Sequence, residues 1–406
     1  MKVITDKKKL DAIFDRGIVS EVLPSKKELY KKLQSGKKLR IYIGADPTAG
    51  ALHLSHAKNY QLLEEFRQLG HEAIVLFGDF TARIGDPTER DSARTQLSAT
   101  EVKKNVKAWV SQIKPLLNFS DKKNPPKILY NSQWLVKLNF EDIIGLASNF
   151  TVQQMLERDM FEKRIEKGNP IHLHEFFYPL MQGYDSVAMD VDIELCGTDQ
   201  IFNALAGRTL LKRLKNKEKF VIAVNLMENP KTKELMSKSR GVGVFLNGDA
   251  NNMFDSIMSQ PDEMIQVMYI NNTRLPLKEL ETILKSDPRS AKIKVAHEIV
   301  KNFFGEKKAD EAQENSRKKF AEKDPSSAKL PHWKVKKNKL SVLDIVLSPQ
   351  DAPLSNLSSK SEAQRLISQG GVQINGETKK DRLEVVEVRD GDLLKIGKRQ
   401  FFKIKL

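Results

Sequence analysis

The chain has 406 residues, 40% of them hydrophobic and 30% charged, with a formal net charge of +15. That length predicts two or three domains. No apolar run reaches the roughly 20 residues that cross a bilayer, and the first residues lack the apolar core of a signal peptide, so we expect a cytoplasmic protein with no membrane partner. The only cysteine, Cys196, excludes an internal disulfide, and no Cys/His set has zinc spacing, so we expect no structural metal.

The N-terminal part of the chain predicts an α/β fold. The lysine-rich residues 1–36 have apolar positions at helical spacing, which favours a helical lead-in. Residues 39–44 and 73–78 are short apolar runs typical of buried strands. Between them, residues 53–69 have helical spacing and end at Gly70, a glycine suited to a helix C-cap. A strand, a helix and a strand within about 40 residues form a βαβ unit, which favours a parallel sheet.

Further apolar runs at residues 128–130 and 220–224 predict two more strands. We therefore predict a Rossmann-like, doubly wound parallel sheet whose ligand lies beyond the carboxyl ends of its strands. The stretch that follows has helical spacing and no glycine between Gly248 and Gly305. The predicted parts are a Rossmann-like domain over 1–225, a loop and α-helical domain over 226–320, a linker over 321–339, and a small α+β domain over 340–406.

The first motif runs from Gly44-Ala45-Asp46-Pro47-Thr48 to His53-Leu54-Ser55-His56, where a predicted strand gives way to a helix. Free N–H groups and the dipole at a helix N-terminus attract phosphate, and two histidines three residues apart share one helical face. Such donors would stabilise the charge that develops when the α-phosphate of ATP is attacked. Taken alone, the motif fits two ordinary surface histidines as well.

The second motif is Met236-Ser237-Lys238-Ser239. A lysine among small polar residues in a loop is a mobile cation that can approach a pyrophosphate leaving group, although a plain basic loop is the alternative. The two motifs occur in this order, about 180 residues apart, on a predicted α/β scaffold. Together they are far more specific than either alone, and they predict an ATP-using enzyme.

With these motifs the chain resembles the class I aminoacyl-tRNA synthetases, in which they usually read His-Ile-Gly-His and Lys-Met-Ser-Lys-Ser. The resemblance is closest to the bacterial tyrosyl-tRNA synthetases and extends over nearly the whole chain. It implies an enzyme that activates L-tyrosine with ATP and Mg²⁺ to tyrosyl-adenylate and pyrophosphate. The tyrosyl group would then pass to the 3′ end of tRNA(Tyr). The resemblance also implies an anticodon-binding role for the helical domain and a homodimer.

The resemblance also assigns a tyrosine pocket. Tyr42 and Asp185 would reach the substrate hydroxyl, and a substrate without that hydroxyl would leave both groups buried and unpaired. Tyr178 and Gln182 lie at i and i+4 on the helical face that Asp185 continues at i+7, and they would bind the α-amino group. The tyrosine-binding residues implied in this way are Tyr42, Thr81, Asp86, Tyr178, Gln182, Asp185 and Gln200.

A nucleotide site is implied beside that pocket. The segment Gly197-Thr198-Asp199-Gln200 resembles the family's Gly-Ser-Asp-Gln, whose glycine and aspartate hold the ATP ribose. The implied ATP-binding residues are Gly44, Asp46, Thr48, His53, His56, Gly197, Asp199, Met236, Ser237, Lys238 and Ser239. The implied catalytic residues, which would stabilise the pyrophosphate side, are His53, His56, Lys238, Arg90 and Arg94.

The C-terminal residues resemble an S4 RNA-binding domain. The match covers Ser361 to Ile374, then Gly391-Asp392 and Gly397-Lys398-Arg399. Basic residues on a small α/β module suit RNA recognised by its shape and backbone. The net charge alone fits a nucleic-acid partner and a solvated lysine-rich surface equally well.

Two positions depart from the family pattern. Ser55 stands where the first motif usually has glycine, and Leu235 replaces the first lysine of the second motif, where Lys233 or Arg240 could substitute. Two other functions also stay open: an RNA-binding module that has lost catalysis, and an enzyme that activates a different amino acid, with tryptophan the first to test.

Overall fold

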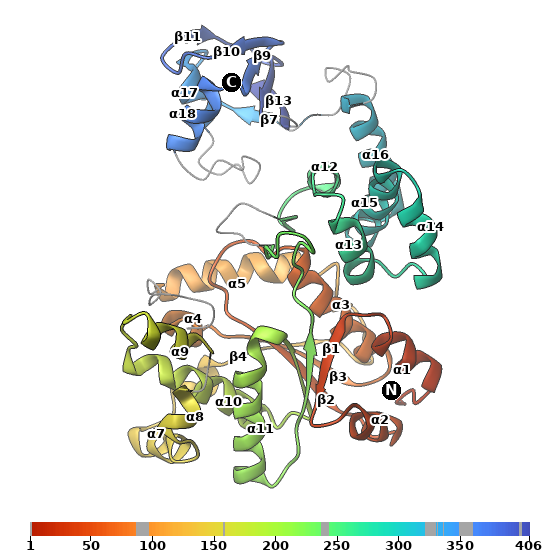
Figure 1. Cartoon of the computed structure of the whole chain (residues 1–406), viewed down its shortest axis with the longest axis vertical. Coiled ribbons are helices and arrows are strands. Elements are labelled where there is room, and N and C mark those ends of the chain that lie inside the picture. Colours follow the sequence, from red (N-terminus) through yellow and green to blue (C-terminus); the bar gives the residue numbers. More distant parts are fainter. Residues whose placement is uncertain are drawn as a thin grey trace. The chain divides into compact units, whose positions relative to one another are not determined.

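We analysed a computed structural model of the chain (Figure 1), which describes residues 2–86, 97–156, 159–236, 243–320, 330, 332–335, 337–348, 360–397 and 400–406. The chain divides into two compact units. The first, the sheet unit, comprises Met1–Glu228 and Val267–Leu277. The second comprises Asn229–Gln266 and Lys278–Leu406. Among the described residues, no helix combines the length and apolar character that a membrane span requires.

The sheet unit is built on six strands in the order β1-β6-β5-β2-β3-β4. All neighbouring pairs are parallel except β1 with β6. The predicted doubly wound parallel sheet is therefore confirmed, with an antiparallel strand added at one edge. The strands are β1 Val19–Leu23, β2 Arg40–Ala45, β3 Glu72–Phe77, β4 Lys127–Tyr130, β5 Ile193–Gly197 and β6 Phe220–Val224.

Two of these strands were not predicted. β1 lies inside residues 1–36, where only helices were expected. It follows α1 (Lys7–Phe14) and precedes α2 (Lys26–Gln34) in the chain, and it pairs with β6. The five residues of β5 alternate apolar side chains with Glu194 and Cys196, so they do not form the uniform apolar run that marked the other buried strands. A charged residue is unusual inside a buried strand, so the pattern of apolar residues did not indicate β5, although Glu194 is buried there at 2% exposed.

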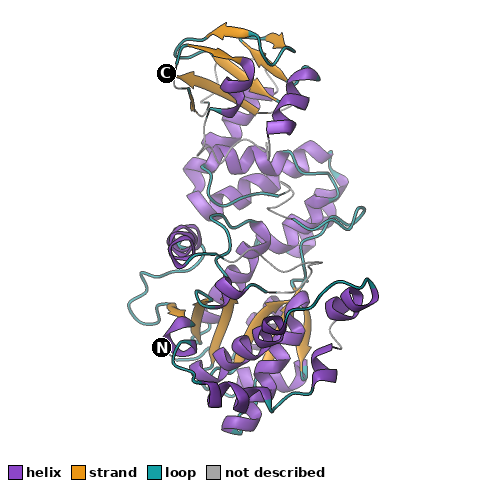
Figure 2. Cartoon of the chain, turned by 90° about the vertical axis from the view of Figure 1, so that its left-hand side faces the viewer, coloured by secondary structure: helices purple, strands orange, loops and turns teal. Residues whose placement is uncertain are grey.

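The strand order creates a switch point between β5 and β2. From β2 the chain crosses through α3 to β3 on one side, and from β5 it crosses through α11 to β6 on the other. Right-handed crossovers that run in opposite directions place their helices on opposite faces of a sheet. Accordingly α3 packs on β2, β3 and β5, and α11 packs on β5 and β6. Figure 2 shows helices packed around the strands of this sheet.

The helices of the sheet unit begin and end as local sequence predicts. α3 starts after the N-cap His53 and ends at Gln68, and Gly70 follows with a φ of 98°, as a helix C-terminus favours. Gly183 of α10 lies so close to Ala206 and Gly207 of α11 that a Cβ would come within 3.2 Å of their backbone. The helices are α1 Lys7–Phe14, α2 Lys26–Gln34, α3 Leu54–Gln68, α4 Thr81–Ile84, α5 Ala99–Ile113, α6 Ser132–Leu135, α7 Phe140–Ala147, α8 Val152–Leu156, α9 Asp159–Glu166, η1 Leu173–Phe176, α10 Phe177–Met189, η2 Thr198–Gln200 and α11 Ile201–Lys215.

The stretch around residues 250–320 is helical, as its spacing predicted. α12 packs against α15 and α16, and an ion pair between the buried Lys319 and the half-buried Asp255 connects α16 to α12. α15 begins at an Asp287 cap with Pro288 at its first position, which is a favourable helix start. The elements are α12 Ala250–Met258, α13 Met264–Asn272, η3 Leu277–Glu279, α14 Leu280–Lys285, α15 Pro288–Phe304 and α16 Glu306–Phe320.

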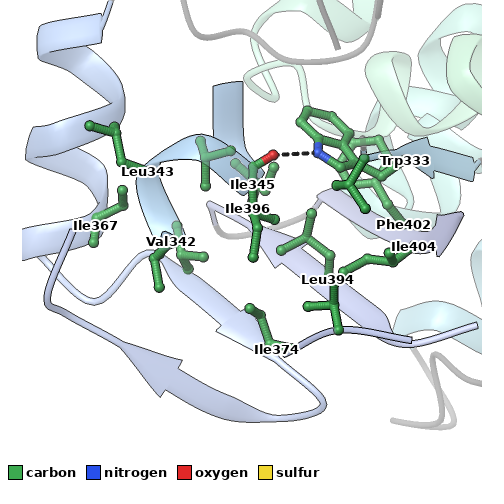
Figure 3. Close-up of a cluster of buried hydrophobic side chains, with 14 of the residues drawn as sticks. Trp333, Val342, Leu343, Ile345, Ile367, Ile374, Leu394, Ile396, Phe402 and Ile404 are labelled. Carbon is green, nitrogen blue, oxygen red and sulfur yellow. Dashed lines mark hydrogen bonds between the residues drawn. The ribbon is translucent and has the colours of Figure 1, made fainter. Parts of the chain in front are cut away.

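The C-terminal residues form a small α+β module with its own core (Figure 3). The indole N–H of Trp333 donates to the carbonyl oxygen of Ile345 at 2.7 Å within that core. The strand that carries Trp333 lies inside 321–339, the range that the sequence suggested as a linker, and it pairs parallel with the last strand. The elements are β7 His332–Lys334, β8 Lys339–Ser341, α17 Val342–Leu347, α18 Lys360–Ser368, β9 Val372–Ile374, β10 Glu377–Lys379, β11 Val385–Glu387, β12 Leu393–Ile396 and β13 Gln400–Lys405.

A buried histidine makes the stability of the sheet unit depend on pH. The His71 side chain is fully buried, its Nδ1 accepts from the Leu39 N–H at 3.3 Å, and burial lowers the pKa of His71 to about 4. A histidine pKa is about 6.5 in an unfolded chain, so the unfolded state takes up the proton first as the pH falls. Stability should therefore fall between pH 6.5 and pH 4, by about 2 kcal/mol at pH 5 relative to neutral pH.

The measurement is urea unfolding of the wild type and of His71→Phe at pH 7 and pH 5. Phenylalanine keeps an aromatic ring beside Phe66 and cannot take up a proton. We expect a smaller loss of stability at the lower pH in the variant than in the wild type. Equal losses in the two proteins would contradict the assignment of this pH dependence to His71.

Candidate active site

The predicted site residues gather at the switch point of the sheet. Asp46 follows β2 directly, and Gly197 ends β5, the strand paired beside it. In open α/β sheets the crevice beyond the carboxyl ends of two such strands is the usual ligand site. The side chains at this edge of the sheet form several hydrogen-bonded groups within the sheet unit, and Asn131 connects the first two of them.

The first group centres on the carboxylate of Asp46. Its Oδ1 accepts from the Thr81 hydroxyl at 2.7 Å, and its Oδ2 accepts from the Tyr178 hydroxyl at 2.9 Å. Burial and the neighbouring Asp46 raise the pKa of Tyr178 well above 10, so the phenol stays a donor. Asp46, assigned to the nucleotide by resemblance, thus contacts two residues assigned to tyrosine.

The second group holds Asp185, which is 3% exposed. The Trp134 indole N–H donates to its Oδ1 at 2.7 Å, and the Asn131 amide donates to its Oδ2 at 3.3 Å. The same amide nitrogen of Asn131 donates to the Thr81 hydroxyl at 3.0 Å, which connects the two groups. Burial raises the pKa of Asp185 well above its usual value, and the two N–H donors oppose that rise.

Sequence reasoning missed Asn131 and Trp134. Asn131 follows β4 directly and Trp134 lies in α6, so both come from the carboxyl end of a strand. That position was the available signal, because the chain that leaves a parallel strand at this edge lies near the ligand crevice.

The third group contains Tyr42, which is fully buried. Its hydroxyl bonds with the Ser186 hydroxyl at 3.1 Å, and Ser186 also accepts from the Lys219 ammonium at 2.9 Å. Lys219 forms an ion pair with Glu194, which accepts from the Gln182 amide at 3.0 Å. Burial raises the pKa of Tyr42 well above 10. The structure places the Tyr42 hydroxyl against Ser186. That Tyr42 and Asp185 both reach the hydroxyl of a substrate tyrosine stays a prediction.

Gln200 connects the residues assigned to ribose and to the amino group. Its amide donates to Asp86 at 2.8 Å and to Asp199 at 3.1 Å, and its carbonyl oxygen accepts from Asn203 at 2.8 Å. Burial raises the pKa of Asp199, the Gln200 donor opposes that rise, and the nearby Asp86 adds to it. Two carboxylates that share one amide donor form a concentrated negative site, which suits cationic or hydroxyl-bearing ligands.

His53 and His56 lie at the N-terminus of α3, on the one face that their spacing predicted. Their ring centroids are 4.0 Å apart, and the main-chain N–H of His53 donates to the ring Nδ1 of His56 at 3.3 Å. The dipole of the 15-residue α3 adds partial positive charge at this end. Imidazole donors and helix N–H groups at one point are suited to bind phosphate.

The loop between β2 and α3 is held in place from outside by α5. Side chains on one face of α5 donate to three carbonyl oxygens of the loop: Asn105 to Pro47 at 2.9 Å, Trp109 to Ala49 at 2.5 Å and Gln112 to Gly50 at 2.9 Å. These bonds satisfy backbone groups that would otherwise be unpaired in a loop of this kind. The bonded carbonyl groups lie on both sides of Thr48 and precede α3, so they restrict the backbone there. No short motif in α5 predicted this role.

Lys58, two residues beyond His56 in α3, is a buried cation that the sequence did not single out. Its ammonium contacts the main-chain and side-chain oxygens of Asn225, just past the end of β6. Burial lowers the pKa of Lys58 to about 7, and the negative charge of Asp199 opposes that shift. The lysine joins α3 to the end of β6 beside the ribose-assigned aspartate.

Several predicted residues fall elsewhere. Arg90, Arg94, Ser237, Lys238, Ser239 and Arg240 lie outside the described residues. Met236 is described and buried, and it belongs to the second unit. The catalytic cations therefore stay predictions, while the tyrosine-assigned set is described in full.

Comparison with known proteins agrees with this geometry. The family model of class I tRNA synthetases for tryptophan and tyrosine matches residues 34–321, and the S4 domain model matches residues 354–390. A tyrosine–tRNA ligase of Carboxydothermus hydrogenoformans is 41% identical over 97% of this chain and 96% of its own length. One from Thermotoga maritima is 39% identical over 97% and 96%. The crystal structure of a truncated mitochondrial tyrosyl-tRNA synthetase from Aspergillus nidulans superposes with a TM-score of 0.66, at 22% identity, over 78% of this chain and 95% of its own.

The family match over residues 34–321, more than half of the chain, shows that the chain is a class I tRNA synthetase. The match over most of the chain, together with relatives that are 36–41% identical over nearly its full length, shows that the chain belongs to the tyrosine–tRNA ligase family within that class.

Gly78, just past β3, leaves the space that Asp46 occupies. A Cβ at position 78 would lie 2.0 Å from Oδ1 of Asp46 and 2.3 Å from Oγ1 of Thr81. We expect Gly78→Ala to displace that pair and to lower the free energy of unfolding by about 1–3 kcal/mol, measured in urea. Gly50→Ala is the matched control, because a Cβ there meets its nearest atom at 3.8 Å. Equal stability of the two variants would show that the Asp46–Thr81 contact is not fixed as described.

Proposed function

We propose that this chain is a tyrosine–tRNA ligase that activates L-tyrosine with ATP and then charges tRNA(Tyr). The observation that carries the choice of amino acid is the buried carboxylate of Asp185, held by N–H donors from Trp134 and Asn131. Burial raises the pKa of Asp185, and these two donors oppose that rise because they stabilise the ionised form. We propose that Asp185 acts in this ionised form, which can only accept hydrogen bonds. It is suited to receive the phenolic hydroxyl of tyrosine.

The amino acid's ammonium group would lie at the other end of the pocket. Tyr178, Gln182 and Asp86 are the residues proposed for it, and Thr81 lines the same region through its bond to Asp46. The carbonyl oxygen of Gln182 and the carboxylate of Asp86 supply the acceptors that an ammonium needs. Gln200, bonded to Asp86, would lie near the substrate's carboxylate.

ATP would bind with its ribose at Gly197 and Asp199 and its phosphates at the N-terminus of α3. The tyrosine carboxylate oxygen attacks the α-phosphorus, a new P–O bond forms, and the bond to the pyrophosphate breaks. No side chain has to act as a nucleophile. His53 and His56 would donate to the phosphates, with Mg²⁺, Arg90, Arg94 and Lys238 on the pyrophosphate side.

The second step would transfer the tyrosyl group to a ribose hydroxyl at the 3′ end of tRNA. Two features support an RNA partner: the S4 family match over residues 354–390 and the net charge of +15. Within the C-terminal module, Lys360 and Arg365 belong to α18 at the start of that match, and Lys360 is exposed. We propose the cytoplasm, where tRNA is charged, as the location.

We also propose a homodimer. Among the described residues from Val136 to Leu173, six apolar side chains are more than half exposed, including Phe140 at 76% and Ile144 at 55% on α7. Met155 and Phe161, in the same part of the chain, are buried in the monomer. α7 and η1 pack on α10, the helix that carries the tyrosine-assigned residues, so an interface here would support the pocket directly. Exposed apolar surface of this kind is typical of contact between subunits.

The first test is tyrosine-dependent exchange of pyrophosphate into ATP by the pure protein. We expect exchange in the wild type and a loss of at least about 100-fold in kcat/KM for tyrosine in Asp185→Asn, because the amide leaves a buried donor facing Trp134 or Asn131. Asp190→Asn is the matched control: Asp190 ends the same helix, and asparagine tolerates its left-handed φ of 50°.

Each alternative function gives a different outcome. Exchange that depends on tryptophan but not on tyrosine would indicate the other amino acid. Binding of tRNA without exchange for any amino acid would indicate an RNA-binding module. Unchanged tyrosine kinetics in Asp185→Asn would refute the pocket assignment while leaving ligase activity intact.

The dimer is tested by sedimentation velocity. The double variant Phe140→Asp/Ile144→Asp should move the wild-type dimer peak to the monomer, because four charges would face each other in a paired interface. Leu284→Asp, at an apolar residue 44% exposed on α14 in the second unit, is the control and should remain dimeric. A wild type that sediments as a monomer would overturn the proposal.

A further inference from the structure

A buried ion pair lies behind the proposed tyrosine pocket. Lys219 immediately precedes β6 and is fully buried, and its partner Glu194 on β5 is 2% exposed. Burying two charges costs desolvation energy, and apolar residues of similar volume often stabilise a fold as well or better. The pair is therefore poor evidence for stability alone, and its other hydrogen bonds indicate what else it does.

Neighbouring elements leave space for this ammonium. Tyr42 and Glu194 are direct partners in the parallel pairing of β2 with β5, so their side chains lie on the same face of the sheet. On α11, Gly207 lacks the Cβ that would otherwise come 2.6 Å from the Lys219 nitrogen and 2.7 Å from the Ser186 hydroxyl. The Lys219 nitrogen also lies 5.9 Å from the centre of the Tyr42 ring.

On one side, the lysine sets the direction of a hydrogen bond. An ammonium can only donate, so the Ser186 oxygen must accept from Lys219 at 2.9 Å. That leaves the Ser186 proton to donate to the Tyr42 oxygen, 3.1 Å away. The Tyr42 proton then points to a different acceptor, which is the Glu194 carboxylate in the protein without ligand. The hydroxyl oxygen of a bound tyrosine would take its place as acceptor. A serine without the lysine could equally accept from Tyr42 and remove that donor.

On the other side, the lysine acts through Glu194. The carboxylate of Glu194 can only accept, so the amide of Gln182 must turn its NH₂ group toward it, at 3.0 Å. The carbonyl oxygen of Gln182 is thereby turned away from Glu194. That oxygen is the end of the amide that can accept from a substrate ammonium. Lys219 neutralises Glu194 and so allows a buried carboxylate to hold this orientation.

We propose that Lys219 is a positioning residue that sets the hydrogen-bond polarity at both ends of the tyrosine pocket, through Ser186 to Tyr42 and through Glu194 to Gln182. The inference rests on the proposed activation of tyrosine. It assigns to one buried ammonium both the selection of a hydroxyl and the orientation of the amide that receives the α-amino group.

Two variants distinguish the link from Lys219 to Tyr42 from the link from Lys219 to Gln182. Ser186→Ala breaks only the link to Tyr42. The double variant Lys219→Met/Glu194→Gln removes both buried charges together, which avoids leaving one charge unpaired, and it breaks both links. Lys217→Met is the matched control: Lys217 is two residues away and pairs with Asp190 and Asp192 outside the pocket.

The readouts are two ratios from the exchange assay. The first divides the inhibition constant of L-phenylalanine, which lacks the hydroxyl, by the KM of L-tyrosine. The second divides the inhibition constant of 3-(4-hydroxyphenyl)propanoic acid, which lacks the amine, by the KM of L-tyrosine. Ser186→Ala should lower the first ratio about tenfold, equivalent to ~1.4 kcal/mol, and leave the second unchanged. The double variant should lower both, and Lys217→Met neither.

A merely structural role gives a different result. If kcat falls but both ratios stay within about twofold of the wild type in both variants, the proposal is overturned. Should the double variant fail to fold, Ser186→Ala still decides the link to Tyr42, and with it the proposal. A wild type without tyrosine-dependent exchange would refute the proposed function itself, which is a separate outcome.

Discussion

The parallel pairing of β2 with β5 is the constraint on which the rest of the sheet unit depends. The connections from these two strands run to opposite sides, and the carboxyl ends of two such strands are where open α/β sheets bind their ligands. Asp46 and Gly197 come to that edge, and Tyr42 comes to lie beside Glu194. A slip of one residue in this pairing would turn Tyr42 to the opposite face, because side chains alternate along a strand. One register therefore sets the proposed pocket and the proposed ribose site together.

Polar side chains in the crevice hold one another before any ligand enters. A continuous path of hydrogen bonds runs from Trp134 through Asp185, Asn131, Thr81 and Asp46 to Tyr178. Groups buried at this depth are costly when unpaired, so each bond restricts its neighbours to one orientation. The pocket reaches a fixed pattern of donors and acceptors through the fold itself. When a ligand binds, ordering of these side chains therefore costs little free energy.

The sequence alone predicts what local patterns encode. The uniform apolar runs of β2, β3 and β6 and the helical spacing of Tyr178, Gln182 and Asp185 are of that kind. Contacts between distant residues are different: Asn131 reaches Asp185 across 54 positions, and nothing local to it indicates that bond. Lys219 is the last residue of a lysine-rich segment whose composition is typical of a solvated surface. Only the fold shows that the Lys219 side chain is buried.

The polarity of the pocket bears on which amino acid it accepts. In the proposed arrangement Tyr42 donates and Asp185 accepts, so the group between them must do both. A phenolic hydroxyl is such a group, the ring of phenylalanine offers neither function, and the indole N–H of tryptophan can donate to Asp185 but cannot accept from Tyr42. Rejection of tryptophan therefore depends on the direction in which Tyr42 donates. In this proposal Ser186 and Lys219 fix that direction, which links a buried ion pair on the same face of the sheet as Tyr42 to the choice between two aromatic substrates.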